Sequence, residues 1–167
     1  MKQHHVRQSL TRLAGVALLA ATVAFSGAAA AQGPPQTTFA MTAAFDYGAP
    51  FLPAKVWQSD GLLHWQRAPF SAPLVSGPFA GGTVSIVSDG VFDLTTFGSN
   101  THGTFAIAAP GGASWSGRYT DRSDGGVLSG NAVGHASDGS TLTLKYSATG
   151  PFVGVVIITY EVTIING

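Results

Sequence analysis

The C-terminal stretch Ser140–Ile165 reads STLTLKYSATGPFVGVVIITYEVTII, two alternating runs on either side of a Gly-Pro turn. In the first run Leu142, Leu144 and Tyr146 fall on one face, and threonine and lysine fall on the other. The second run alternates in the same way, with valine, isoleucine and tyrosine on its more apolar face. A period of two residues is typical of β-strands with one buried face. The stretch therefore predicts two strands joined by a turn.

The same pattern extends back to Thr37, and no part of the chain from there on shows a sustained helical period. The chain has 22 glycines and nine prolines, which interrupt it too often for long helices. About ten runs have the length and composition of strands. These predicted strands are 37–46, 55–58, 61–67, 82–88, 91–97, 102–108, 113–120, 127–135, 140–147 and 153–165.

The tripeptide Ser-Asp-Gly occurs four times, beginning at Ser59, Ser88, Ser123 and Ser137. Asp-Gly favours tight hairpin turns because glycine takes a positive φ freely and aspartate tolerates it. We therefore interpret each copy as a turn, most sharply the copy at residues 88–90, between TVSIV and VFDLTTF. A calcium loop at 121–125 (DRSDG) is the alternative, although no glutamate follows to complete a ligand set.

The last predicted strand, 153–165, is long and apolar enough to promote aggregation if its edge stays open. Pairing it with the first strand, 37–46, removes that edge. We therefore predict an all-β domain, a single antiparallel up-and-down barrel of about eight to ten strands. Residues 68–81 contain Pro69, Pro73 and Pro78, so we expect either an edge segment with bulges or a loop across one barrel mouth.

The N-terminus has the features of a signal peptide. Basic residues precede an apolar run at 13–25, and Ala29-x-Ala31 offers a cleavage site. We divide the chain into a signal peptide at 1–31, a flexible lead-in at 32–36 and the barrel at 37–167. The protein is then exported to a bacterial periplasm or the medium, with no membrane insertion after cleavage. A retained N-terminal anchor is the alternative.

Composition argues against several classes of partner. Three of the eight Lys and Arg residues precede Gln32, so the remaining chain has five basic and eight acidic residues, a net charge of −3. Without a basic patch, neither nucleic acid nor an anionic membrane is an expected partner. The chain has no cysteine, and its histidines lack metal-ligand spacing, so we predict no metal site and no cofactor.

Few residues are available for catalysis. Beyond the signal region there are three histidines and one glutamate, and no Gly-x-Ser-x-Gly motif is present. This favours a non-enzymatic protein and leaves Asp93, His102 and Glu161 as candidate ionisable groups for the lumen. For Asp93 and Glu161 the alternative is an outward, solvated position. Trp65 should face inward and His64 outward. Trp115 and Tyr119 flank Gly117 on one face, where these rings either fill the core or leave a notch for a flat ligand. The candidate ligand-binding residues are Trp65, Trp115, Tyr119, His64 and Glu161.

Three segments contain regularly spaced glycine and aromatic residues: THGTF at 101–105, WSGRY at 115–119 and LSGNAVGH at 128–135. They resemble small exported bacterial β-barrels of uncharacterised function and, more distantly, the dirigent and allene oxide cyclase barrels. That resemblance implies a glycine-rich barrel around an apolar cavity. No catalytic residue of those families has a match here. WSGRY and VGH are also similar to segments of the biotin-binding barrels, whose other biotin contacts have no counterpart.

Three functions follow as hypotheses. The first is an exported, non-enzymatic barrel that binds a small apolar or amphipathic ligand in its lumen. The second is an isomerase or cyclase acting on a hydrophobic substrate, which needs an ionisable group inside the lumen. The third is a structural or interaction protein of the cell envelope that uses the barrel exterior or the long apolar C-terminal strand for assembly, with an exposed strand edge and homo-oligomers in solution.

Overall fold

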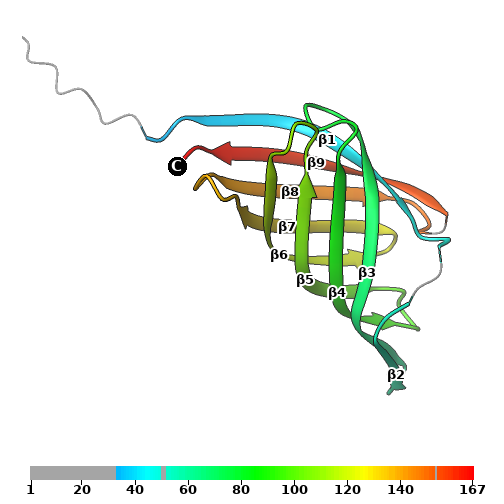
Figure 1. Ribbon diagram of the computed structural model, residues 1–167. Helices are drawn as coiled ribbons and strands as arrows, with labels where there is room; N and C mark the ends of the chain where they lie inside the picture. Colours follow the sequence, from blue (N-terminus) through cyan, green and yellow to red (C-terminus); the bar gives the residue numbers. More distant parts are fainter. Residues whose placement is uncertain (1–32, 50–51, 153) are drawn as a thin grey trace, which may run out of the picture. The chain divides into compact units, whose positions relative to one another are not determined.

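The computed structural model describes residues 33–49, 52–152 and 154–167, which form one β domain (Figure 1). The predicted signal peptide lies outside these residues. No helix within them is long and apolar enough to cross a membrane. The strands are β1 (Gln36–Asp46), β2 (Lys55–Ser59), β3 (Leu62–Ser76), β4 (Thr83–Asp93), β5 (Ser99–Ala108), β6 (Ser114–Asp124), β7 (Val127–His135), β8 (Thr141–Thr149) and β9 (Val155–Ile165).

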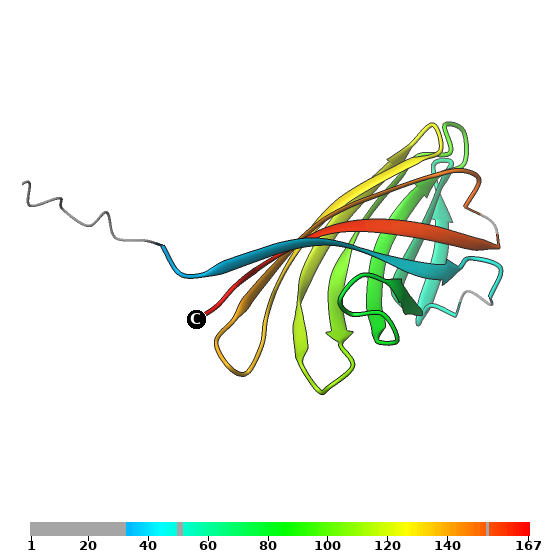
Figure 2. The same cartoon turned by 90° about the horizontal axis from the view of Figure 1, so that it is seen from above.

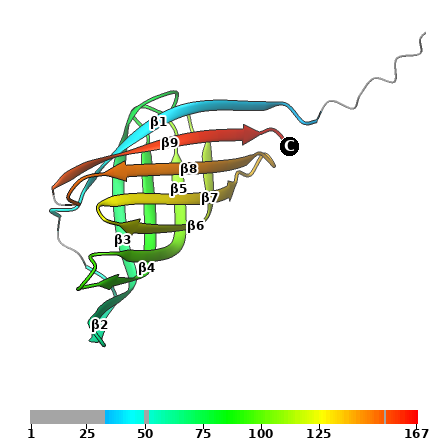
Figure 3. The same ribbon diagram turned by 180° about the vertical axis from the view of Figure 1, so that it is seen from behind.

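Eight of these strands close into an antiparallel barrel, which confirms the predicted fold. The strand order is β1-β9-β8-β7-β6-β5-β4-β3-β2, and β1 also pairs with β3. β1 and β9 pair along their full length from Gln36↔Ile165 to Asp46↔Val155, and they lie side by side in Figures 2 and 3. As the apolar pattern of β9 predicts, both of its edges are covered. β2 pairs only with β3 and extends beyond the barrel as a hairpin (Figure 1).

Three of the four Ser-Asp-Gly copies lie at turns, but the one at residues 88–90 does not. Asp60 and Gly61 have φ values of 51° and 77° in the β2–β3 turn. Residues 88–90 instead lie inside β4, so the predicted strands 82–88 and 91–97 are one strand that ends at Asp93. The carboxylate of Asp89 accepts a hydrogen bond of 2.7 Å from the backbone N–H of Arg67, across the sheet in β3.

The proline-rich segment continues β3 and is an edge segment with a bulge. The register between β3 and β4 shifts between Trp65 and Ala68, and Arg67 there has a φ of 55°. Pro69 and Pro73 pair with β4 on one side, while β1 reaches β3 only at Leu74 and Ser76. A strand with one open side tolerates residues that lack an N–H donor. Residues 77–81, which include Pro78, instead form the β3–β4 turn, and the buried ring of Phe79 places this part of the segment over one end of the barrel.

The barrel interior differs between its two ends. We call the end at which β4 and β6 finish the mouth, and the opposite end the closed end. At the closed end the rings of Phe79 and Trp115 stack with centroids 5.1 Å apart, and Trp115 Nε1 donates to Ser140 Oγ at 3.0 Å. Met41, Ile107 and Leu142 fill the space beside them and are fully buried. Side chains therefore fill this end, and the cavity of the candidate site lies toward the mouth.

Inward-facing glycines lie opposite aromatic rings of the next strand. Gly90 pairs with Trp65, and Gly130 with Tyr146. A Cβ atom on Gly90 would overlap with the indole of Trp65, and one on Gly130 would overlap with the phenol of Tyr146. Each of these two glycines thus makes room for an aromatic ring of the neighbouring strand, whereas a Cβ on Gly103 or Gly117 would overlap with a backbone carbonyl oxygen of the neighbouring strand.

Candidate functional site

A partly enclosed cavity of about 340 Å³ occupies the mouth half of the barrel. This volume is at the small end of the range for ligand pockets. Aromatic and aliphatic side chains make most of its wall, and the polar ones are concentrated on β5 and β6. The aromatic lining consists of Tyr47, Trp65, Phe70, Phe92, Phe97, Tyr119 and Phe152, the aliphatic lining of Ala49, Leu63, Ile86 and Leu128, and the polar lining of Ser88, Ser99, Thr101, Asp121 and Ser123.

Asp121 is the only charged residue of that lining. It lies on the inner face of β6, two residues beyond Tyr119. One carboxylate oxygen accepts a hydrogen bond from the hydroxyl of Thr101, and the other accepts one of 3.0 Å from the phenol of Tyr146. Burial raises the pKa of Asp121, and the two hydrogen bonds oppose that rise because they stabilise the ionised form.

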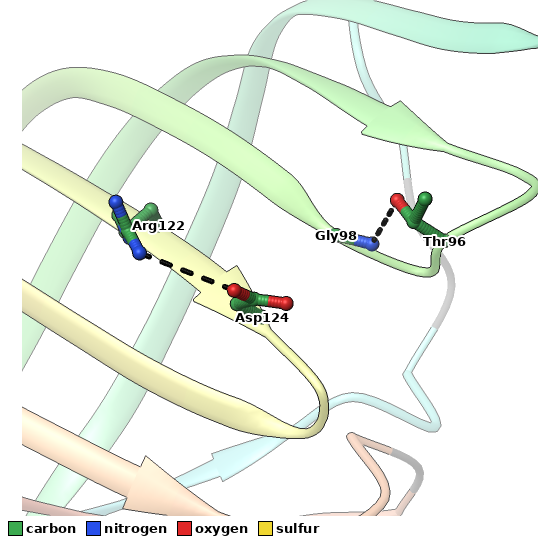
Figure 4. Close-up of polar contacts among 4 residues, drawn as sticks. All are labelled: Thr96, Gly98, Arg122 and Asp124. Atoms are coloured by element: carbon green, nitrogen blue, oxygen red, sulfur yellow. Dashed lines mark hydrogen bonds and ion pairs between the residues drawn. The ribbon is translucent and has the colours of Figure 1, made fainter.

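Asp121 has no cationic partner among the described residues. The ion pair that the structure shows there joins Arg122 to Asp124 at 4.0 Å, on the outside of the mouth rim (Figure 4). Both of its side chains are largely exposed, so it contributes little to stability. In the same view the backbone N–H of Gly98 donates to Thr96 Oγ1 at 3.4 Å, which helps to hold the β4–β5 turn at the rim.

All four tyrosines of the chain line the interior near Asp121. Burial is the main cause that raises the pKa of each one, and the charge of Asp121 adds to it. The pKa of Tyr119 rises to about 12, although nearby hydroxyls of Ser88 and Thr101 counteract part of the rise. The Tyr119 hydroxyl is buried and makes no hydrogen bond of ordinary geometry within the described residues. These phenols therefore stay neutral donors at physiological pH.

The structure brings two of the five candidate residues to the cavity, Trp65 and Tyr119. As predicted, Trp65 faces inward, where its Nε1 donates to Ser88 Oγ at 3.2 Å. Trp115 instead belongs to the closed-end core. The notch expected at Gly117 does not exist, because a Cβ there would overlap with the backbone of Val133 on β7.

His64 and Glu161 lie away from the cavity. His64 stacks on Trp57 with ring centroids 4.9 Å apart, on the β2–β3 hairpin. Glu161 is exposed on the outer face of β9, opposite Lys145 of β8. His102 is also exposed. Asp93 accepts hydrogen bonds from the N–H groups of Thr95 and Thr96, and these hydrogen bonds lower its pKa.

Sequence reasoning missed Asp121 as a lumen residue. In the sequence it belongs only to the alternative calcium loop at 121–125. The signal was present, since Asp121 shares the period-two face of Trp115 and Tyr119. Asp124 lies on the opposite face, so the two carboxylates do not converge. The described residues contain no group of three His, Cys, Asp or Glu side chains that could hold a metal ion.

Comparison with known proteins found no matching family model, no similar curated protein and no similar solved structure. The class of the molecule therefore rests on its fold: a closed antiparallel β-barrel of eight strands with one additional strand. Its candidate site combines an apolar wall, a hydrogen-bonded carboxylate and a buried phenol. Such a site can bind a small molecule through apolar contact and orient it by one polar group.

Proposed function

We propose that this protein binds a small apolar or amphipathic ligand in the mouth half of its barrel, without chemical conversion. The observation that carries the proposal is the cavity of about 340 Å³. An eight-stranded barrel can be filled completely by its own side chains. This one is filled only at the closed end, and the space at the mouth is lined by seven aromatic side chains.

The rim of the mouth supports the same proposal. The side chains of Leu52 and Phe97 are 71% and 68% exposed, and Leu94 is also exposed. Phe97 is part of the cavity wall as well. Apolar groups that reach from the rim into the cavity give an apolar ligand a continuous surface on its way in.

Native mass spectrometry of the protein purified from cells that express the full chain tests this proposal. We expect a bound small-molecule mass on the wild type. Leu63→Trp, which fills the cavity, should remove it. Val133→Trp, an outward position on β7, should retain it. A wild-type protein with no bound mass, or equal retention by both variants, would contradict the proposal.

An isomerase acting on a hydrophobic substrate is the second candidate, because Asp121 supplies the ionisable lumen group that such chemistry needs. Incubation of the co-purified ligand with the protein in D₂O tests it. Deuterium uptake into carbon positions with the wild type, but not with Asp121→Asn, would favour the isomerase over simple binding. An assembly role through the edge of β9 loses its basis, because β1 and β8 cover both edges.

A further inference from the structure

We propose that the ligand is a hydrophobic amine, whose ammonium group binds Asp121 inside the ring of aromatic side chains at the mouth. This inference rests on the proposed function and names the chemical class of its ligand. Three observations carry it: the half-buried carboxylate of Asp121 without a cationic partner among the described residues, the distribution of basic residues, and the aromatic wall.

The carboxylate of Asp121 has acceptor capacity left. An ionised carboxylate offers about four lone-pair sites. The structure shows two hydrogen bonds to it, from Thr101 and Tyr146. Both of these partners are neutral hydroxyls. A buried carboxylate without a cation is unfavourable, and an ammonium group supplies both the charge and the donors that it lacks.

Within residues 33–49, 52–152 and 154–167 the protein does not supply that cation. The five basic side chains of the described residues, Lys55, Arg67, Arg118, Arg122 and Lys145, are all exposed. None of them lines the cavity, and no histidine does either. The wall therefore carries a single ionisable acid, with no base to compete for it or to attract an anionic ligand.

The aromatic wall favours a cation over a neutral polar group. Seven aromatic side chains line the cavity, Trp65 and Tyr119 among them. The face of an aromatic ring is electronegative and attracts ammonium groups, most strongly where water is excluded. The same rings pack against the hydrocarbon part of the ligand. One wall thus serves both ends of a hydrophobic amine.

The groups that face Asp121 predict a simple pH dependence for the binding of an amine. They are the phenols of Tyr146 on β8, Tyr160 on β9, Tyr47 after β1 and Tyr119 on β6, all of which are neutral at physiological pH. Asp121 is then the only group of the site that changes charge in acid. Protonation of Asp121 should weaken the binding of an amine and leave a neutral alcohol unaffected.

Calorimetric titration with three probes of one skeleton tests the inference: 4-phenylbutylamine, 4-phenylbutan-1-ol and 4-phenylbutanoate. On the wild type at neutral pH, we expect the amine to bind at least tenfold more tightly than the alcohol and the acid not to bind. Asp121→Asn should bind the amine only as tightly as it binds the alcohol. Asp124→Asn removes an exposed carboxylate at the same rim and should change nothing.

If Asp121→Asn fails to fold, the pH dependence of binding to the wild type tests the inference alone. Its preference for the amine over the alcohol should disappear as the pH falls and Asp121 takes up a proton. Equal affinity for amine and alcohol, or tightest binding of the acid, overturns the amine inference and leaves the proposed function standing. Binding of none of the three probes overturns the amine inference, and the native mass spectrum of the wild type then decides the proposed function.

Discussion

Gly130 shows how closely the interior around Asp121 is packed. A Cβ atom there would overlap with the phenol of Tyr146 and would lie 2.6 Å from Cβ of Asp121. We predict that Gly130→Ala destabilises the protein by about 1–3 kcal/mol, the usual cost of overpacking. Urea unfolding measures this. Gly33→Ala is the control, because a Cβ on Gly33 has no atom within 4 Å. Equal stability of the two variants would contradict the packing described here.

Asp121 should also affect stability as a function of pH. Burial raises its pKa in the folded protein, so the unfolded chain releases this proton at a lower pH than the folded one. Stability from this group is therefore greatest below its unfolded pKa and is lost as the pH rises through the folded pKa. Asp93 and Asp138, whose pKa values are lowered, have the opposite effect and lose stability in acid.

The difference in free energy of unfolding between wild type and Asp121→Asn isolates the contribution of Asp121, because Asp93 and Asp138 are common to both proteins. As the pH falls from about 7 to about 4, we predict that the wild type gains free energy of unfolding relative to the variant. Thermal or urea unfolding across this range measures it. A difference that does not change with pH would mean that Asp121 is solvated like an ordinary surface carboxylate.

At the scale of elements, the bulge of β3 depends on one side chain of β4. The backbone N–H of Arg67 leaves the regular ladder at the bulge, and the carboxylate of Asp89 accepts it at 2.7 Å. We predict that Asp89→Ala destabilises the protein by about 1–2 kcal/mol, because a polar backbone group loses its partner. Asp124→Ala, which removes only an exposed and distant ion pair, should cost less than about 0.5 kcal/mol. A similar cost for both variants in urea unfolding would contradict this role of Asp89.

This bulge also shows what the sequence can and cannot predict. Alternation identified nearly every strand, since the period of two is a local property of each one. Ser-Asp-Gly at residues 88–90 has the same local chemistry as the copies that form turns. It lies inside β4 because Trp65 and Arg67, in another strand, need the space over Gly90 and the acceptor on Asp89. A requirement that comes from a neighbouring strand is invisible until the register is known.

The candidate site was less predictable than the fold for the same reason. Trp65 and Tyr119 were found because a large aromatic residue on an alternating strand favours the inner face. Asp121 is on that face too, but an aspartate is ordinarily assigned to the surface or to a turn. The hydroxyls of Thr101 and Tyr146, brought in from β5 and β8, offset part of the cost of its burial.

For the whole molecule, the pairing of β1 with β3 is the weakest part of the barrel wall. It consists of two residue pairs, Thr42↔Ser76 and Ala43↔Leu74, with an irregularity between them. β1 and β9, in contrast, pair along their full length. The hydroxyls of Thr42 and Ser76 are 2.7 Å apart, so cysteines at these positions are close enough for a disulfide. The chain has no cysteine of its own to compete for oxidation.

We predict that the double variant Thr42→Cys/Ser76→Cys is about 2–4 kcal/mol more stable when oxidised than when reduced. The rate of ligand association should not change, because we expect the ligand to enter through the mouth. Mouth residues such as Ala49, Phe97 and Phe152 line the cavity, whereas the β1–β3 pairs are not part of its lining. Thermal unfolding with and without reductant measures the first effect, and stopped-flow mixing with 4-phenylbutylamine measures the second. A slower association in the oxidised protein would mean that the ligand enters by separation of β1 from β3, and the exposed apolar rim would then need another explanation.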